Sequence, residues 1–227
     1  MPWFDTDFLN FLAELQLHNE REWFQANKAR FKEKVEAPFK AFVQEMIDRL
    51  AARDARFAIT PQEAIFRIYR DTRFSKNKQP YKTHMSAVIA PGGRKGHLAE
   101  GMYLEFSADH VRLYGGIYRP DTQTLYRLRK YLVAHLDEFE RLLDDPAFRQ
   151  RFDTIRGERN KRLPREFMAA AERQPLLYNK SFYYFHNFDP EVALRDDLVE
   201  LLLEYYEAGR PMGEFLATAA GFRQMPD

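Results

Sequence analysis

Three apolar segments between residues 85 and 118 follow one another so closely that no helix fits between them. They read MSAVIA, GMYLEFSA and VRLYGGIY, and their β-branched and aromatic residues are typical of strands. The loop PGGRKG separates the first two, and Asp109-His110 fits a tight hairpin between the last two. Parallel neighbours would need a long crossover connection, so this spacing predicts an antiparallel sheet. The stretches AIFRIYR, before them, and KSFYYFHNF, after them, raise the expected number to four or five strands.

Helical spacing dominates the two ends of the chain. A first helix is expected to start at Asp5 or Thr6, because these residues cap helices well. Its apolar stripe consists of Phe8, Leu9, Leu12 and Leu15. We expect Asn19 to cap the next helix and Pro38 to lie in the first turn of a third. Beyond residue 120 two more stripes follow, made of Leu125, Leu128, Leu132, Leu136 and Phe139, and of Leu194, Leu198, Leu201, Leu202 and Tyr205.

These patterns predict an α+β fold in which an antiparallel sheet of four to five strands packs against flanking helices. A chain of 227 residues without internal repeats or a long linker suits a single domain, spanning residues 1–227. We expect residues 1–60 to be helical, residues 61–120 to form the sheet, and residues 121–227 to be mainly helical.

The overall charge gives no general attraction to nucleic acid or to a membrane surface. Lys and Arg number 35 against 34 Asp and Glu, so any affinity for a polyanion must come from a local patch. The chain has no cysteine, which excludes disulfides, thiolate metal sites and cysteine nucleophiles. The beginning MPWFDTDFLNFLAEL lacks the basic region of a signal peptide, and no apolar run approaches the roughly 20 residues of a membrane span. We therefore expect a cytoplasmic protein that does not bind membranes.

The stretch RIYRDTRFSKNKQPYKTH, residues 67–84, concentrates positive charge. It carries six Lys and Arg residues against one acid, Asp71, in an otherwise nearly neutral chain. Arginine forks match phosphate and carboxylate oxygens, lysine adds a mobile charge, and interleaved tyrosines can stack on a ring. The pattern indicates a small anionic, phosphate- or carboxylate-bearing ligand, bound with or without turnover. The predicted ligand-binding residues are Arg67, Tyr69, Arg70, Arg73, Lys76, Lys78 and Lys82.

Three residues of this motif are candidates for catalysis. Tyr81 and His84 are the candidate proton-transfer groups, and Asp71 would orient an arginine. The sequence identifies no cofactor, and both an enzyme and a binding protein fit the motif. Two alternatives stay open: a nucleic-acid-binding module that uses the same cations and tyrosines, and an interaction protein whose basic loop docks on an acidic partner. A solvated loop locked by a pair between Asp71 and an arginine fits the residues equally well.

Two further features carry weaker signals. The six histidines form no metal-binding spacing, and although His84, His97 and Glu105 are of ligand type, we predict no metal site. A second basic run contains Arg156, Arg159, Lys161, Arg162 and Arg165. A solvated surface segment is the favoured interpretation of this run, and a shared pocket with the first basic motif is the alternative.

The central stretch FRIYRDTRFSKNKQPYKTH resembles the defining motif of the domain-of-unknown-function 2461 family. The similarity extends to FLNFLAELQLHNEREWFQANKARF, GGIYRP, LPREF and PLLYNKSF, and so covers nearly the whole chain. This resemblance implies a bacterial-type soluble protein with one α+β domain, and it assigns no catalytic residue. It places in the motif Arg67, Arg70, Asp71, Arg73, Phe74, Ser75, Lys76, Lys78, Pro80, Tyr81, Lys82 and His84.

Overall fold

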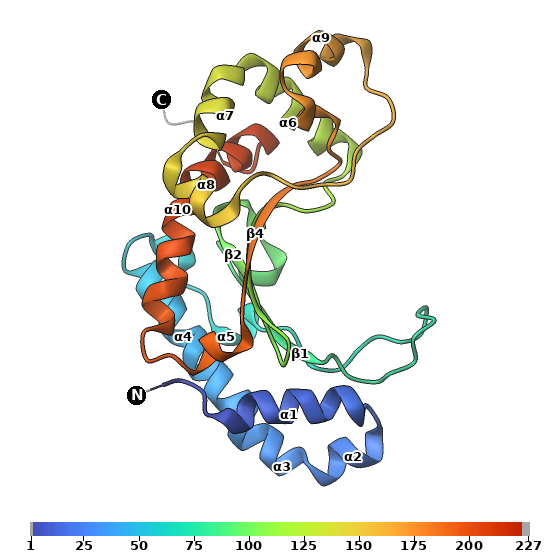
Figure 1. The fold of residues 1–227 in the computed structure, drawn as a ribbon, viewed down its shortest axis with the longest axis vertical. Helices are drawn as coiled ribbons and strands as arrows, with labels where there is room; N and C mark the ends of the chain where they lie inside the picture. The colour runs from blue at the N-terminus through green and yellow to red at the C-terminus, as the bar shows by residue number, and fades with distance from the viewer. Residues whose placement is uncertain (1, 224–227) are drawn as a thin grey trace. The chain divides into compact units, whose positions relative to one another are not determined.

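The computed structural model in Figure 1 describes residues 2–223 and has an α+β fold. Its antiparallel sheet has the order β1-β2-β3-β4. The strands are β1 (His84–Ile89), β2 (Met102–Ser107), β3 (Val111–Ile117) and β4 (Phe182–Phe188). The predicted fold class is therefore confirmed, and so are the three closely spaced strands and the hairpin at Asp109-His110.

The stretch Ala64–Arg70 does not form the regular strand that its alternation predicts. Helix α5 (Pro61–Ala64) ends there, and the residues after it make two isolated antiparallel bridges, Ile65 with Ala87 and Tyr69 with Tyr81. The two bridges are four residues apart in the segment 65–69 but six residues apart in the opposite segment 81–87. The opposite segment therefore has two extra residues between the bridges. Extra residues interrupt a ladder as in a β-bulge, and this prevents a continuous fifth strand.

The described chain divides into two compact units. The first contains residues up to Gly96, then Tyr103–Leu113 and Asn187–Leu203. The second contains His97–Met102, Tyr114–His186 and the residues from Glu204 onward. The predicted single cooperative domain stays a prediction, which a single unfolding transition would support.

The first unit holds α1 (Thr6–Leu17), α2 (Arg21–Ala26), α3 (Lys28–Arg30) and α4 (Ala37–Ala51), with a π-helical segment η1 (Phe31–Glu36) before α4. It also holds α5 and the short 3-10 turns η2 (Ala55–Phe57), η3 (Gly93–Lys95) and η6 (Pro190–Leu194). The second unit holds η4 (Leu98–Glu100), α6 (Thr122–Ala134), α7 (Leu136–Leu143), α8 (Pro146–Phe152), α9 (Arg165–Arg173) and η5 (Pro175–Tyr178). Helix α10 (Leu198–Ala220) begins in the first unit and continues in the second.

The core of the first unit lies on one face of the sheet. The ring of Phe106 in β2 is fully buried, and four other ring centroids lie 5.3–6.3 Å from its own, those of Phe4, Phe8, Phe39 and Phe42. Because side chains alternate along a strand, burial of Leu104 and Phe106 against the helices directs Tyr103 and Glu105 to the opposite face. That opposite face carries the candidate site.

The N-terminal helices follow the sequence predictions only in part. Helix α1 buries Phe8, Leu12 and Leu15 as expected, but it buries Phe11 rather than Leu9. Asp5 caps α1 by accepting hydrogen bonds from the backbone of Asp7 and Phe8, as expected. Asn19, in contrast, does not cap α2, because its buried amide bonds both backbone groups of Tyr81 at 3.1 Å. A buried amide needs partners for its donor and its acceptor, and one residue's backbone supplies both here.

Pro38 lies in the first turn of α4 as predicted, but the residues directly before α4 are helical too. Proline cannot donate to the carbonyl four residues earlier and its ring crowds that carbonyl. The preceding residues adopt the wider π-helical register in η1, where the N–H of Ala37 donates to the carbonyl of Lys32. The sequence pattern gave no sign of this segment, which turns Phe31 and Lys32 toward a groove described below.

The second unit is built around the buried ring of Tyr184. Its hydroxyl donates a 2.8 Å hydrogen bond to the carbonyl of Gly209 in α10. A Cβ atom on Gly209 would lie 2.6 Å from a ring carbon of Tyr184, so only glycine allows this close approach. The second basic run lies in this unit, where Arg156 and Arg159 form bridges with Tyr183 and Asn179. None of the helices formed by residues 2–223 is long and apolar enough to cross a membrane.

Candidate functional site

A polar cluster occupies the face of the sheet opposite the helices of the first unit. Strand alternation brings its members to one side, since each strand contributes every second residue. All of them belong to the first unit: Lys82 and His84 before and at the start of β1, Tyr103 and Glu105 on β2, His110 and Arg112 at the start of β3, and Asn187 on β4. We call this set the open-face cluster.

Glu105 lies at the centre of the open-face cluster. Its carboxylate accepts hydrogen bonds from the Tyr103 hydroxyl and from His110 Nε2, each at 2.9 Å. His84 Nε2 lies 3.7 Å from the same carboxylate and Arg112 Nη1 lies 3.9 Å from it. Arg112 also donates through Nε to Asn187 Oδ1 at 2.6 Å. One half-buried carboxylate thus lies within 3.9 Å of side chains from β1, from its own strand β2 and from the start of β3.

The electrostatic surroundings alter the protonation of this cluster. Burial lowers the pKa of His84 below its usual value of 6.5, and the neighbouring Lys82 lowers it further, although Glu105 opposes both. Burial alone would raise the pKa of Glu105, but the hydrogen bond from His110, the proximity of His84 and the hydrogen bond from Tyr103 outweigh it and lower that pKa. His84 is therefore mainly a neutral imidazole at pH 7, beside an ionised carboxylate.

Lys82 is a half-buried cation among other cations. Its Nζ lies 4.8 Å from the centroid of the Phe66 ring, and the Arg94 guanidinium lies 5.7 Å from that same centroid. Burial lowers the pKa of Lys82, the positive charges of Arg67 and Arg94 lower it further, and only Glu105 acts in the opposite direction. Among residues 2–223, Lys82 forms no ion pair. The charge of Lys82 therefore has no bonded counterion within the described part of the chain.

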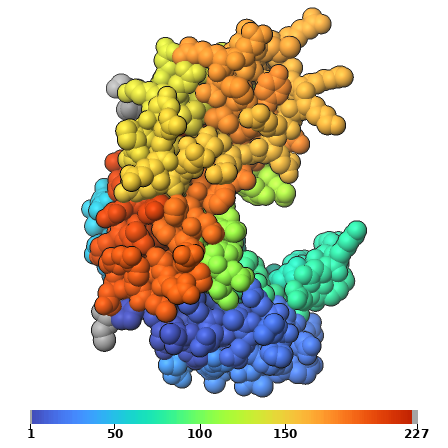
Figure 2. All heavy atoms as spheres, in the orientation of Figure 1, coloured from blue at the N-terminus to red at the C-terminus, as the bar shows by residue number. Residues whose placement is uncertain are grey.

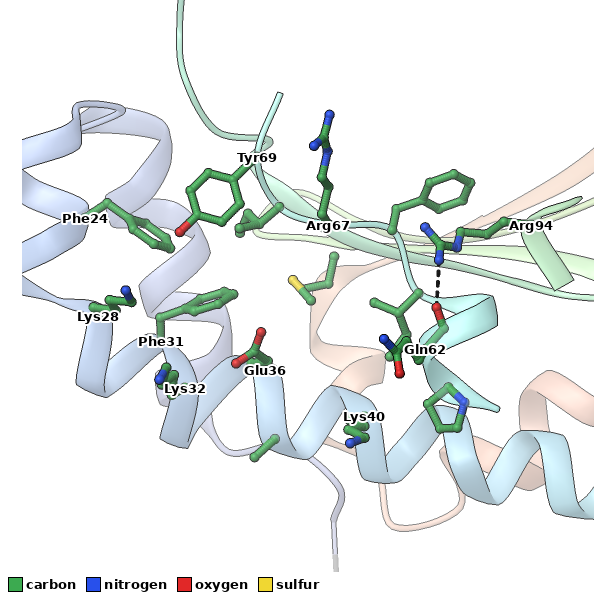
Figure 3. A pocket seen from close by; sticks show the side chains of 16 residues that line it. Phe24, Lys28, Phe31, Lys32, Glu36, Lys40, Gln62, Arg67, Tyr69 and Arg94 are labelled. Atoms are coloured by element: carbon green, nitrogen blue, oxygen red, sulfur yellow. Dashed lines mark hydrogen bonds between the residues drawn. The ribbon is translucent and has the colours of Figure 1, made fainter. Parts of the chain in front are cut away.

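Beside this cluster, a groove of about 770 Å³ runs along residues 65–69. Helical residues 24–40 form its other wall, and Figure 3 shows Tyr69 turned toward Phe24 and Phe31 of that wall. Figure 3 also shows Arg67 directed away from the row of Lys32, Glu36 and Lys40. Both Arg67 and Tyr69 are exposed, while Ile68 between them is buried.

The residues between Arg70 and Pro80 form a loop that projects from the first unit (Figure 2, teal). At its base Asp71 accepts hydrogen bonds from Arg73 Nε at 3.0 Å and Nη2 at 2.7 Å. Lys78 donates to the carbonyl of Thr72 at 3.0 Å, and Lys76 is exposed. The structure therefore does not bring Arg73, Lys76 and Lys78 together with Lys82, although the sequence groups them in one motif.

The remaining predicted residues fall in different surroundings. Tyr81 is 2% exposed, and its ring stacks on Phe24 with the centroids 4.0 Å apart. Burial raises the pKa of Tyr81, so its hydroxyl keeps its proton at neutral pH. Arg70 is half-buried and ties the base of the loop through its backbone, which donates to the carbonyl of Pro80. Only His84 of the three catalytic candidates lies in the open-face cluster.

The family of the chain follows from a comparison with family models. A model described as a conserved hypothetical protein, DUF2461, matches residues 7–215. The chain belongs to the DUF2461 family. No curated protein matches it. The matched region of this DUF2461 protein includes the whole open-face cluster and the whole groove, and its description assigns no activity.

Sequence reasoning identified Lys82 and His84 in this DUF2461 protein but missed His110 and Arg112, and it considered Glu105 only as a metal ligand. A signal was present, because MYLEFS and HVRLY place polar residues between buried ones at a spacing of two. A charged residue at a half-buried position of a strand usually has a specific partner or role. Among residues 2–223, no group of three or more His, Asp or Glu side chains has the geometry to hold a metal ion.

Proposed function

We propose that this DUF2461 protein binds a small phosphate- or carboxylate-bearing anion at Lys82, on the open face of the sheet. The observation that carries the proposal is the state of Lys82, a half-buried ammonium crowded by Arg67 and Arg94 without an ion-pair partner in the described chain. A buried cation without a counterion costs stability, and an anion would remove that cost through charge-assisted hydrogen bonds of roughly 1.5–3 kcal/mol each.

The neighbouring residues define what such a site could do with its ligand. The neutral imidazole of His84 can accept a proton. The Glu105 carboxylate lies 3.7 Å from His84 Nε2 and would attract the imidazolium that then forms. An anion beside Lys82 would raise the pKa of His84, because a nearby negative charge favours the protonated, positively charged imidazole. Proton transfer at a bound phosphate or carboxylate ester is the reaction type that this pair supports, should the ligand be turned over.

Thermal unfolding in the presence of anions tests the proposal. A ligand at about 100 times its Kd stabilises a protein by about 2.7 kcal/mol, and each kcal/mol raises the Tm of a chain this long by roughly 2–4 °C. Phosphate or sulfate should therefore raise the Tm by several degrees more than chloride does at matched ionic strength. Arg67→Ala and Lys82→Met should remove most of this gain.

The matched control is Lys130→Met, which replaces an exposed lysine in α6 of the second unit. That variant should keep the full gain. The proposal would be overturned if phosphate, sulfate and chloride raised the Tm equally. It would also be overturned if phosphate raised the Tm of Lys82→Met as much as that of the unchanged protein.

Nucleic-acid binding is the second candidate, and one observation favours it. Phe74 is 96% exposed within the projecting loop, between the cations Arg73 and Lys76. Exposed aromatic rings among cations stack on unpaired bases. Under this alternative Phe74→Ala would weaken binding of a single-stranded oligonucleotide, and binding would fall steeply with salt. Under the first proposal Phe74→Ala leaves the phosphate gain unchanged.

A further inference from the structure

Residues 65–69 include backbone groups that form no hydrogen bond with the rest of the described chain. Phe66, Ile68 and Arg70 hydrogen-bond the opposite strand through Ser86, Lys82 and Pro80. Backbone groups of alternate residues point to opposite edges of a strand. The N–H and C=O groups of Arg67 and Tyr69 form no hydrogen bond among residues 2–223. By this alternation we expect them to point away from the strand that pairs with Phe66, Ile68 and Arg70.

This free edge lines the groove of about 770 Å³, and the facing helical wall carries a row of charges. Along this wall, in Figure 3, lie Lys28, Lys32, Glu36 and Lys40 at intervals of four residues. All four side chains are exposed. None of them forms an ion pair within the described residues. With Arg67 and Arg94 the lining has five cations against one carboxylate, a formal charge of +4.

Below the charged row the groove has an apolar floor. Phe31 is 5% exposed, and Ile68 and Met85 are 4% and 3% exposed. The edge, the floor and the charged wall thus offer three different kinds of contact side by side: backbone hydrogen bonds, apolar pockets and positive charge. An extended peptide presents the matching set, because its alternate side chains point in opposite directions and its backbone pairs along one edge.

We infer that the groove binds an extended acidic segment of another protein, which adds as a strand to the free edge at Arg67 and Tyr69. Apolar side chains of the segment would face Phe31, Ile68 and Met85, and its carboxylates would face the lysines. The dimensions agree, since the helical wall from Lys28 to Lys40 is about 18 Å long at 1.5 Å per residue. Five or six extended residues, at about 3.3 Å each, cover that length.

A fluorescein-labelled, seven-residue peptide of alternating Glu and Val is the probe, and fluorescence anisotropy measures its Kd. The triple variant Lys28→Glu, Lys32→Glu and Lys40→Glu should weaken binding at least tenfold. Since all three side chains are exposed, this variant should fold normally. Lys130→Glu, in the second unit, should bind as the unchanged protein does.

Two further measurements separate strand addition from charge attraction alone. The same peptide with N-methylated backbone amides keeps its charges but cannot pair along the edge, and it should lose most of the affinity. Hydrogen exchange of the Arg67 and Tyr69 amides should slow at least tenfold when the unmodified peptide is bound. Equal affinity for both peptides, or unchanged exchange, would overturn the inference.

This inference stands apart from the proposed anion site. The Lys82→Met variant should bind the peptide normally, although phosphate no longer raises its Tm by more than chloride does. In the lysine triple variant, phosphate should still raise the Tm as it does in the unchanged protein. Tighter binding of a single-stranded oligonucleotide than of the acidic peptide in this groove would also overturn it.

Discussion

Replacing Lys82 by methionine should stabilise the ligand-free protein. The change removes a half-buried charge whose pKa is lowered by burial and by Arg67 and Arg94, and which has no ion pair in the described residues. It also removes the contact of the ammonium with the Phe66 ring at 4.8 Å, a cation–π interaction of roughly 0.5–1 kcal/mol at exposed sites and more when buried. A methionine sulfur near the same ring restores about 0.3–1.5 kcal/mol, so these two terms nearly cancel.

The remaining term is the cost of the charge itself. Leaving a buried polar group without a partner costs about 1–3 kcal/mol, and Lys82 is only half-buried, so we expect a net gain near 1 kcal/mol. For a chain of this length that gain corresponds to an increase in Tm of about 2–4 °C. The assay is differential scanning calorimetry in chloride buffer, with Lys130→Met as the control for loss of one positive charge.

The same variant should be less stable than the unchanged protein once phosphate is present in excess. The variant should thus be the more stable protein in chloride and the less stable one in phosphate. This reversal is what we expect if Lys82 serves to bind an anion. If Lys82→Met lowers the Tm in chloride by several degrees, the lysine stabilises the fold directly and the reasoning behind the anion site is wrong.

Two other predictions follow from the structure. Gly209→Ala should destabilise the protein by about 1–3 kcal/mol, because the added Cβ would lie 2.6 Å from the Tyr184 ring. Without that clash, alanine would stabilise the helix by about 1 kcal/mol relative to glycine. A higher Tm of the variant would therefore contradict the packing described. The second concerns pH. Since the pKa of His84 is lower in the folded protein than its ordinary 6.5, the unfolded chain binds the proton more tightly, and stability should fall as pH drops below about 6.5. His84→Asn should lose less stability than the unchanged protein between pH 7.5 and 5.5 in denaturant titrations, and parallel profiles would show that the His84 environment is not as described.

The helices were largely predictable because their apolar stripes are local features. Phe39, Phe42, Val43, Met46, Ile47 and Leu50 all lie on the buried face of α4. The cap at Asn19 was not predictable, because its partner Tyr81 lies 62 residues further along the chain. A side chain with a tertiary partner no longer follows its local preference.

The candidate site shows the same division between local and distant information. The alternation within a single stretch is visible locally, since Ile68 is buried between the exposed Arg67 and Tyr69. Which residues of other strands would lie beside Lys82 depends on strand register, and register is set by turns and bulges that composition does not reveal. The Glu105 carboxylate therefore remained unrecognised as the centre of the cluster, and the loop cations appeared to belong to one site.

The irregularly paired residues 65–69 border both proposed sites. A regular fifth strand would extend the sheet and present an ordinary edge, which proteins commonly protect from aggregation with lysines. The row formed by Lys28, Lys32 and Lys40 could serve that protective purpose alone. Charge reversal separates the two roles, because glutamates protect an edge as well as lysines do, whereas only a positive row attracts an acidic strand. A triple glutamate variant that stays monomeric yet no longer binds the acidic peptide would therefore assign the row to recognition rather than to protection.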